Sequence, residues 1–159
     1  MKLAIKNNWL SLGGASTVQD IDGNDVLMVK GKVFSFTRQK FVMTVNEVPV
    51  YTVRNKFFSL FGRTALVLDP IGNVVATVRK KILSLSSSFV VESTLGQVEI
   101  TGNIFGYDYH IVVNGCEVGH IARKISLRDS FVLDIDDAFD HQLFVALVIA
   151  IDNVTDRNR

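Results

Sequence analysis

The sequence predicts a mainly β protein, a closed antiparallel barrel of about twelve strands that encloses an apolar C-terminal helix. Three observations lead to this fold class. A hairpin unit recurs along the chain, a bend recurs within the unit, and one segment near the C-terminus is apolar on every side. We expect a single domain over residues 1–159, with strands over about 2–134, a central helix over about 137–152 and a short polar tail over 153–159.

The composition is that of an ordered chain with a sizeable core, because 48% of the 159 residues are hydrophobic. The 17 Lys and Arg residues nearly balance the 16 Asp and Glu residues. A dedicated nucleic-acid binder needs an excess of positive charge, so no nucleic-acid partner is expected. A single cysteine, Cys116, favours a reducing compartment, and polar residues interrupt the N-terminal segment before a signal-peptide core can form. We therefore expect a cytoplasmic protein, one that could also act peripherally at the inner membrane surface.

The recurring unit is a turn, two aliphatic residues three apart, a lysine three further on, and an apolar pair that serine often follows. Its clearest copy has the turn at 70–73, then Val75, Val78 and Lys81. A degraded copy around Leu95 lacks the lysine. The regular spacing indicates that each copy is one structural unit.

Each unit is predicted to be a β-hairpin. Pairs such as Asp22-Gly23 tolerate the positive φ of tight turns, and the flanks are rich in Val, Ile, Phe and Thr. The spacing of three between Val75 and Val78 breaks the two-residue period of a strand, so we expect a β-bulge or sharp bend in every copy. Repeated bends curl a sheet, and closure into a barrel removes its exposed edges.

The run FVALVIAI near the C-terminus is predicted to be a buried helix. The segment 138–151 contains no Gly or Pro, and the aspartates over 134–137 are interpreted as caps of its first turn. Nine apolar residues rise about 13 Å, which is less than half of a bilayer core of about 30 Å. A transmembrane segment is therefore not expected, and the helix is placed inside the barrel, where each covers the other.

Two stretches and the final helix carry a resemblance to a known family. The stretches are VQDIDGNDVLMVKGKVFSF and LVLDPIGNVVATVRKKILSL, in which a D-x-x-G turn precedes K-x-[FL]-S at a fixed offset. With the apolar C-terminal segment they resemble the LURP-one-related family over essentially the whole chain. The resemblance implies the fold that this family shares with tubby C-terminal domains and phospholipid scramblases, a closed barrel around a central helix. It also suggests lipid binding, because tubby domains bind phosphoinositide headgroups through basic side chains.

The lysines of the unit occupy equivalent positions, so a closed barrel would place them at related points around its wall. The functional interpretation is a basic collar that binds an anionic lipid headgroup, another small anion or a membrane surface. The alternative is that these lysines cap strand ends and keep edges soluble, an interpretation favoured by the net charge of only +1. The predicted binding residues are Lys32, Lys56, Lys81, Lys124, Arg79 and Arg123, with Lys6 as a further candidate.

No motif for catalysis occurs in the sequence. It has no G-x-S-x-G elbow and no phosphate-binding loop, so neither an enzyme nor a cofactor is predicted. Asp108 with His110, and Cys116 with His120, form short pairs, but neither pair has a third ligand at the spacing of a zinc site. No metal site is predicted, and these residues are interpreted as hydrogen-bonded structural groups.

Two classes of function remain open at this point. The first is a binding module for an anionic phospholipid headgroup or other small anion. The second is a structural or protein–protein interaction domain that presents exposed aromatic side chains such as Trp9 or Tyr51 to a partner.

Overall fold

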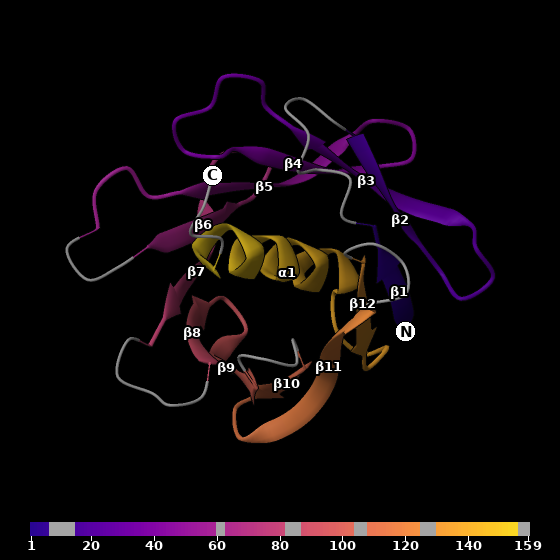
Figure 1. Ribbon diagram of the computed structural model, residues 1–159, viewed down its shortest axis with the longest axis vertical. Coiled ribbons are helices and arrows are strands. Elements are labelled where there is room, and N and C mark those ends of the chain that lie inside the picture. The colour runs from indigo at the N-terminus through magenta and orange to yellow at the C-terminus, as the bar shows by residue number, and fades with distance from the viewer. Residues whose placement is uncertain (7–14, 60–62, 82–86, 104–107, 125–129, 156–159) are drawn as a thin grey trace.

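The computed structural model describes residues 1–6, 15–59, 63–81, 87–103, 108–124 and 130–155. Within these ranges the chain forms strands followed by one helix (Figure 1). The strands are β1 (Lys2–Ile5), β2 (Ala15–Gln19), β3 (Asp25–Gly31), β4 (Lys40–Thr44), β5 (Pro49–Asn55), β6 (Thr64–Leu68), β7 (Val74–Lys80), β8 (Ser87–Ser93), β9 (Gly96–Asn103), β10 (Asp108–Val113), β11 (Cys116–Lys124) and β12 (Ser130–Ile135), and the helix is α1 (His141–Thr155).

The strands form one closed antiparallel barrel, which confirms the predicted fold class. Each strand pairs with its neighbours in the sequence, and β1 closes the barrel by pairing with β12 from Lys2↔Asp134 to Ile5↔Phe131. Figure 1 shows the sheet curving around α1 from β1 to β12. Among the described strands, closure leaves no unpaired edge strand to pair with another chain.

A β-bulge interrupts four of the hairpins at the same place in the unit. In each case the register skips one valine: Val26 in β3, Val50 in β5, Val75 in β7 and Val118 in β11. The bulge lets residues three apart face the core, because Val75 packs against it while Val78 is fully buried. The expectation of a bulge in every copy is wrong for the degraded copy, since β8 and β9 pair without interruption from Ser87↔Gly102 to Ser93↔Gly96.

Two of the turns repeat one hydrogen-bonding pattern. The carboxylate of Asp20 accepts hydrogen bonds from the backbone amide and the side chain of Asn24, and that of Asp69 does the same with Asn73. The predicted positive φ occurs at the glycine of these turns, with 95° at Gly72. The D-x-x-G-N sequence thus forms the turn through its aspartate, its glycine and its asparagine together.

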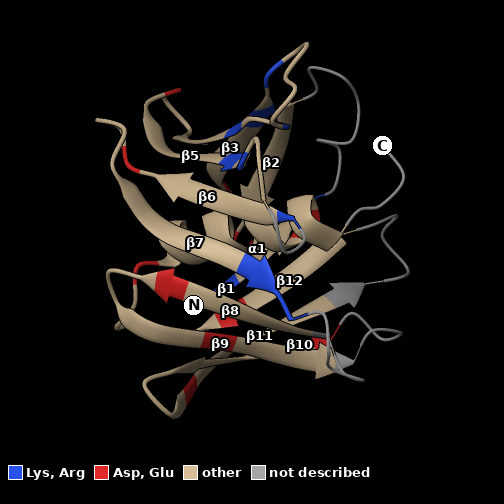
Figure 2. Cartoon of the chain, turned by 90° about the vertical axis from the view of Figure 1, so that its left-hand side faces the viewer, with Lys and Arg blue, Asp and Glu red and all other residues tan. Residues whose placement is uncertain are grey.

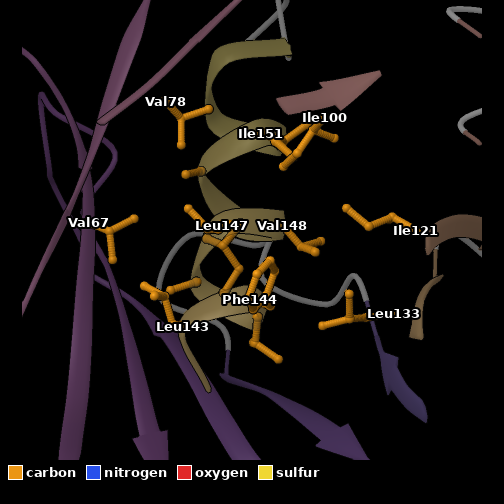
Figure 3. Packing of buried hydrophobic residues seen from close by; sticks show 14 of the residues in the cluster. Val67, Val78, Ile100, Ile121, Leu133, Leu143, Phe144, Leu147, Val148 and Ile151 are labelled. Atoms are coloured by element: carbon orange, nitrogen blue, oxygen red, sulfur yellow. The ribbon is translucent and has the colours of Figure 1, made fainter. Parts of the chain in front are cut away.

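Helix α1 fills the interior of the barrel, as predicted. Figure 3 shows Val67 and Val78 on one side of the helix and Ile121 and Leu133 on the other. The buried residues of the helix are Leu143, Phe144, Val145, Ala146, Leu147, Val148, Ile149, Ala150, Ile151, Asn153 and Val154. No helix among the described residues is long and apolar enough to cross a membrane.

The helix begins later than predicted, at His141 rather than near residue 137, and it continues past residue 152 to Thr155. The cap is Asp140, whose Oδ1 accepts hydrogen bonds from the amides of Gln142 and Leu143 at 2.9 and 3.2 Å. The assignment of the cap to residues 134–137 is wrong. The amide of Asp136 still bonds to the carbonyl of Val118, so the chain must leave the sheet before a helix can start.

Polar contacts fix both ends of α1 to the wall. The hydroxyl of Tyr51 donates to Asp140 at 2.7 Å at the N-terminal end. At the other end, Lys40 Nζ lies 3.2 Å from Asp152 Oδ2, and Asn153 Nδ2 donates to the carbonyl of Arg38 at 3.1 Å. The first of these contacts attaches the helix to the start of β4, and the second attaches it to the loop over 32–39.

Candidate functional site

The recurring lysines lie at one end of the barrel. Because all neighbouring strands are antiparallel, the odd-numbered strands end at the same rim. Lys32, Lys56 and Lys81 directly follow β3, β5 and β7, and Lys124 is the last residue of β11. We call this end, defined by these four residues, the lysine rim; Figure 2 shows basic residues at the end of β7, on the side where the C-terminus emerges.

Three of these lysines occupy structurally equivalent positions, as the repeat indicates. Their backbone amides donate to carbonyls at or just before the start of the next strand: Lys32 to Gln39, Lys56 to Thr64 and Lys81 to Ser88, at 2.8, 2.8 and 2.9 Å. All three side chains are exposed. The backbone of β11 continues the pattern with Lys124↔Ser130, whereas the side chains of Arg123 and Lys124 lie outside the described part of the chain.

Arg79, another predicted binding residue, lies in β7 rather than beyond it. Its guanidinium forms an ion pair with Glu92 on β8. The pair offsets the charge of Arg79, so this residue adds less to the lysine rim than the three lysines do.

The opposite rim carries negative charge. It contains the turns at 20–24, 45–48 and 69–73 and the segment at 136–140, with Asp20, Asp22, Asp69 and Asp136 among its acidic residues. Glu47 and Asp137 also lie there, but they are paired with Lys30 and with the N-terminal ammonium group. We call it the acidic rim. A shallow depression of about 620 Å³ opens there, lined by Met1, Glu117, Val118, Gly119, His120, Asp134, Ile135, Asp136 and Asp137. Carboxylates there disfavour an anionic ligand, so the two rims differ in the ligands that they suit.

Exposed phenylalanines lie beside the lysines. Phe34 and Phe36 in the loop after β3 are 91% and 98% exposed, and Phe57 and Phe58 after β5 are 71% and 81% exposed. The amide of Asn55, the last residue of β5, donates to the carbonyl of Thr37 at 2.6 Å, which joins the first loop to the strand that leads into the second. We call residues 32–39 and 56–59 the aromatic loops. Their four phenylalanines present apolar surface to solvent next to Lys32 and Lys56.

The first aromatic loop has a defined and strained backbone. Phe34 and Arg38 have φ values of 56° and 52°, in the left-handed region that side chains disfavour. The carbonyl of Ser35 accepts from the amide of Arg38 at 3.2 Å, and its hydroxyl accepts from the amide of Gln39 at 2.9 Å. Such strain costs of order 1–3 kcal/mol per residue and is typical of functional loops.

These phenylalanines are not among the site residues predicted from the sequence, although the recurring unit includes an apolar pair after the lysine. The recurring unit could have revealed them, because its lysine marks the end of the strand and the apolar pair that follows must then lie outside the sheet. Tyr51, named as an exposed aromatic, is half-buried, and its hydroxyl is bonded to Asp140. Burial of the phenol is the largest cause that raises the pKa of Tyr51 above its ordinary value, and the hydrogen bond to Asp140 raises it further. Trp9 lies outside the described residues.

A group of potential metal ligands lies on the outer face of β10 and β11. Asp108, His110 and His120 each offer a ligand atom, and these atoms lie within 4.8 Å of one another. The sequence spacing suggested only two separate pairs. The antiparallel register brings them together because His110 lies directly opposite His120.

These features define the chain as a closed, helix-filled β-barrel with one basic rim. Within that class it belongs to the LURP-one-related family, whose model matches residues 1–152. The fold is similar to that in an X-ray structure of a protein from Arabidopsis thaliana, with a TM-score of 0.69 and 17% sequence identity over 98% of this chain and 91% of that one. No curated protein matches the sequence.

Proposed function

We propose that this protein is a non-enzymatic binding module that docks on anionic membrane surfaces through the lysine rim and the aromatic loops. The observation that carries the proposal is the placement of four exposed phenylalanines beside exposed lysines at one end of the molecule. The lysines attract anionic headgroups, and the phenylalanines enter the boundary between headgroups and acyl chains.

The chain is nearly neutral as a whole, but its charges are distributed unevenly between the two rims. A net charge of +1 gives a weak field at long range, but the two rims differ in charge. Exposed charges farther away than the Debye length of about 10 Å are largely screened by salt. A membrane in contact with the lysine rim therefore interacts with the charges of that rim and not with those of the acidic rim. The lysine rim is therefore favoured for docking.

The expected energies are sufficient for reversible binding. Each lysine near an anionic leaflet contributes about 1 kcal/mol, so Lys32, Lys56 and Lys81 together contribute about 3 kcal/mol. A fully buried phenylalanine contributes roughly 1.5–3 kcal/mol, and partial insertion contributes a fraction of this. Since anionic lipids are concentrated in the cytoplasmic leaflet, we place the protein at that surface, in keeping with its single cysteine.

The filled interior supports binding rather than catalysis. The helix occupies the space in which a barrel of this kind could enclose a substrate. We therefore assign recognition to the outer surface at the lysine rim, where the exposed lysines and phenylalanines lie.

Co-sedimentation with vesicles tests the proposal. Vesicles of phosphatidylcholine with phosphatidylserine should retain the protein at low salt, whereas phosphatidylcholine alone should retain much less. Neutralising Lys32, Lys56 and Lys81 together to Gln should weaken partition about a hundredfold, as about 3 kcal/mol implies. Lys2→Gln, at the acidic rim, is the matched control and should leave retention unchanged.

Failure would point to the protein-interaction alternative. If anionic vesicles do not retain the wild-type protein, or if the triple variant binds like the wild type, the membrane proposal is wrong. Vesicles that contain a phosphoinositide in place of phosphatidylserine distinguish recognition of one headgroup from general attraction to anionic lipid.

A further inference from the structure

The outer face of β10 and β11 presents four side chains that could act together. Asp108 and His110 are two residues apart on β10, and His120 lies across from His110 on β11. Glu117, also on β11, lies within hydrogen-bonding distance of His110, with Oε1 2.9 Å from Nδ1. The two imidazole rings are 5.2 Å apart between centroids.

The β-bulge of β11 places Glu117 and His120 on the same face. In a regular strand, residues three apart point to opposite faces. The register skips Val118, so Val118 and Ile121 both turn toward the core, and Glu117 and His120 both face outward. The feature that curves the barrel thus also assembles this cluster.

We propose that His110, His120 and Asp108 bind a divalent transition-metal ion, with Zn²⁺ as the best fit, and that Glu117 supports the site from outside. Imidazole nitrogens and a carboxylate oxygen are the donors that zinc accepts. Neighbouring ligand atoms of a tetrahedral zinc site with bonds of about 2.0–2.1 Å are roughly 3.4 Å apart. Ligand atoms within 4.8 Å of one another reach this spacing by small side-chain rotations.

The existing hydrogen bonds match the roles assigned to the four residues. Glu117 bonds to Nδ1 of His110, which leaves Nε2 of that ring for the metal. A carboxylate behind a ligating histidine is the usual supporting arrangement in zinc proteins. Nε2 of His120 bonds to Asp108, so a zinc ion would replace this direct bond with two bonds to itself. The remaining coordination position faces solvent, because Asp108 and His110 are exposed.

The cluster is separate from the residues that carry the proposed membrane contact. It contains none of Lys32, Lys56, Lys81 or the four phenylalanines of the aromatic loops. Zinc binding and vesicle retention can therefore be tested independently, and loss of one does not predict loss of the other.

Zinc titration of the tag-free protein tests the inference. Competition with a chromophoric chelator should reveal one saturable site per chain, and Co²⁺ should give the visible absorption of a four-coordinate complex. His120→Gln and His110→Gln should each weaken binding at least tenfold. Glu117→Gln should weaken it by about 10–100-fold, as loss of a supporting carboxylate does elsewhere.

The chain supplies its own controls. His141, which lies at the start of α1, is the third histidine, and Cys116 is the sole thiol. His141→Gln and Cys116→Ser should bind zinc like the wild type, with folding of every variant checked by circular dichroism. The inference is overturned if the wild type shows no saturable site, if the His110→Gln/His120→Gln double variant retains it, or if either control variant loses it.

Discussion

At the scale of single residues, Phe34 combines a strained backbone with an exposed side chain. Its φ of 56° disfavours any side chain, yet the phenyl ring is 91% exposed and contributes little to the fold. A residue that costs stability and gains no burial indicates a role outside the folded chain, which we assign to membrane contact. Phe36, which is 98% exposed in the same loop, has no positive φ and serves as a natural comparison.

Replacing Phe34 by glycine should therefore stabilise the protein while weakening membrane binding. Glycine adopts positive φ without strain, and we expect a gain of about 1 kcal/mol in the free energy of unfolding after its larger unfolded-state entropy is subtracted. Phe36→Gly should give no such gain, although both variants should lose vesicle retention. Urea unfolding and co-sedimentation measure the two effects. A Phe34→Gly variant that is less stable than the wild type would contradict the role assigned to strain.

The turn aspartates predict how stability depends on pH. Desolvation raises the pKa of Asp69, but the hydrogen bonds from Asn73 and from the amides of Ile71 and Gly72 together outweigh it, and the pKa lies below the ordinary value of 3.8. A carboxyl group whose pKa is lowered by folding stabilises the protein above its unfolded pKa and loses this contribution as pH falls through the folded pKa. The loss should therefore occur below about pH 4.

Asp69→Asn tests this dependence. The variant keeps a side-chain acceptor for the turn but cannot ionise, so its Tm should fall less than that of the wild type between pH 4 and the most acidic pH at which both remain folded. Thermal unfolding followed by circular dichroism over this range is the measurement. Parallel pH profiles for the two proteins would show that ionised Asp69 does not stabilise the turn.

At the scale of elements, the repeated hairpin was the part of the structure that sequence predicted best. The spacing of Val75 and Val78 predicted the bulge because the side-chain period of a strand is fixed. The start of α1 was missed because several aspartates could cap it, and only the sheet pairing of Asp136 decides among them. The cluster of Asp108, His110 and His120 was missed because strand register sets it, and spacing along one strand does not reveal the residue opposite.

The ion pair between Lys40 and Asp152 is one of the polar contacts that attach α1 to the wall. Their side chains are only 11% and 15% exposed, so removing one partner leaves a poorly solvated charge. Asp152→Ala should cost about 3 kcal/mol or more in the free energy of unfolding, measured in urea. The double variant Lys40→Met/Asp152→Leu should recover much of this loss, because neither charge remains buried. Equal losses in the single and double variants would contradict this explanation.

At the scale of the whole molecule, the barrel gives the chain two chemically different ends. The lysine rim and the aromatic loops lie at one end, together with the C-terminal end of α1, and the acidic rim lies at the other. The sequence predicted the equivalence of the lysines but not the opposing charge of the turns, which follows from the direction of the strands. This difference between the ends is the basis of the proposal that a nearly neutral chain docks on an anionic surface in one orientation.

The most direct test of this orientation is the fluorescence of an environment-sensitive probe attached at each end of the barrel. In a Cys116→Ser background, single cysteines replace Phe36 and Phe58 in the aromatic loops and Ile71 at the acidic rim, which is 85% exposed. We predict that anionic vesicles shift the emission of the probes at 36 and 58 to shorter wavelength and leave the probe at 71 unchanged. A shift at 71, or no shift at 36 and 58 under conditions in which vesicles retain the protein, would contradict docking through the lysine rim.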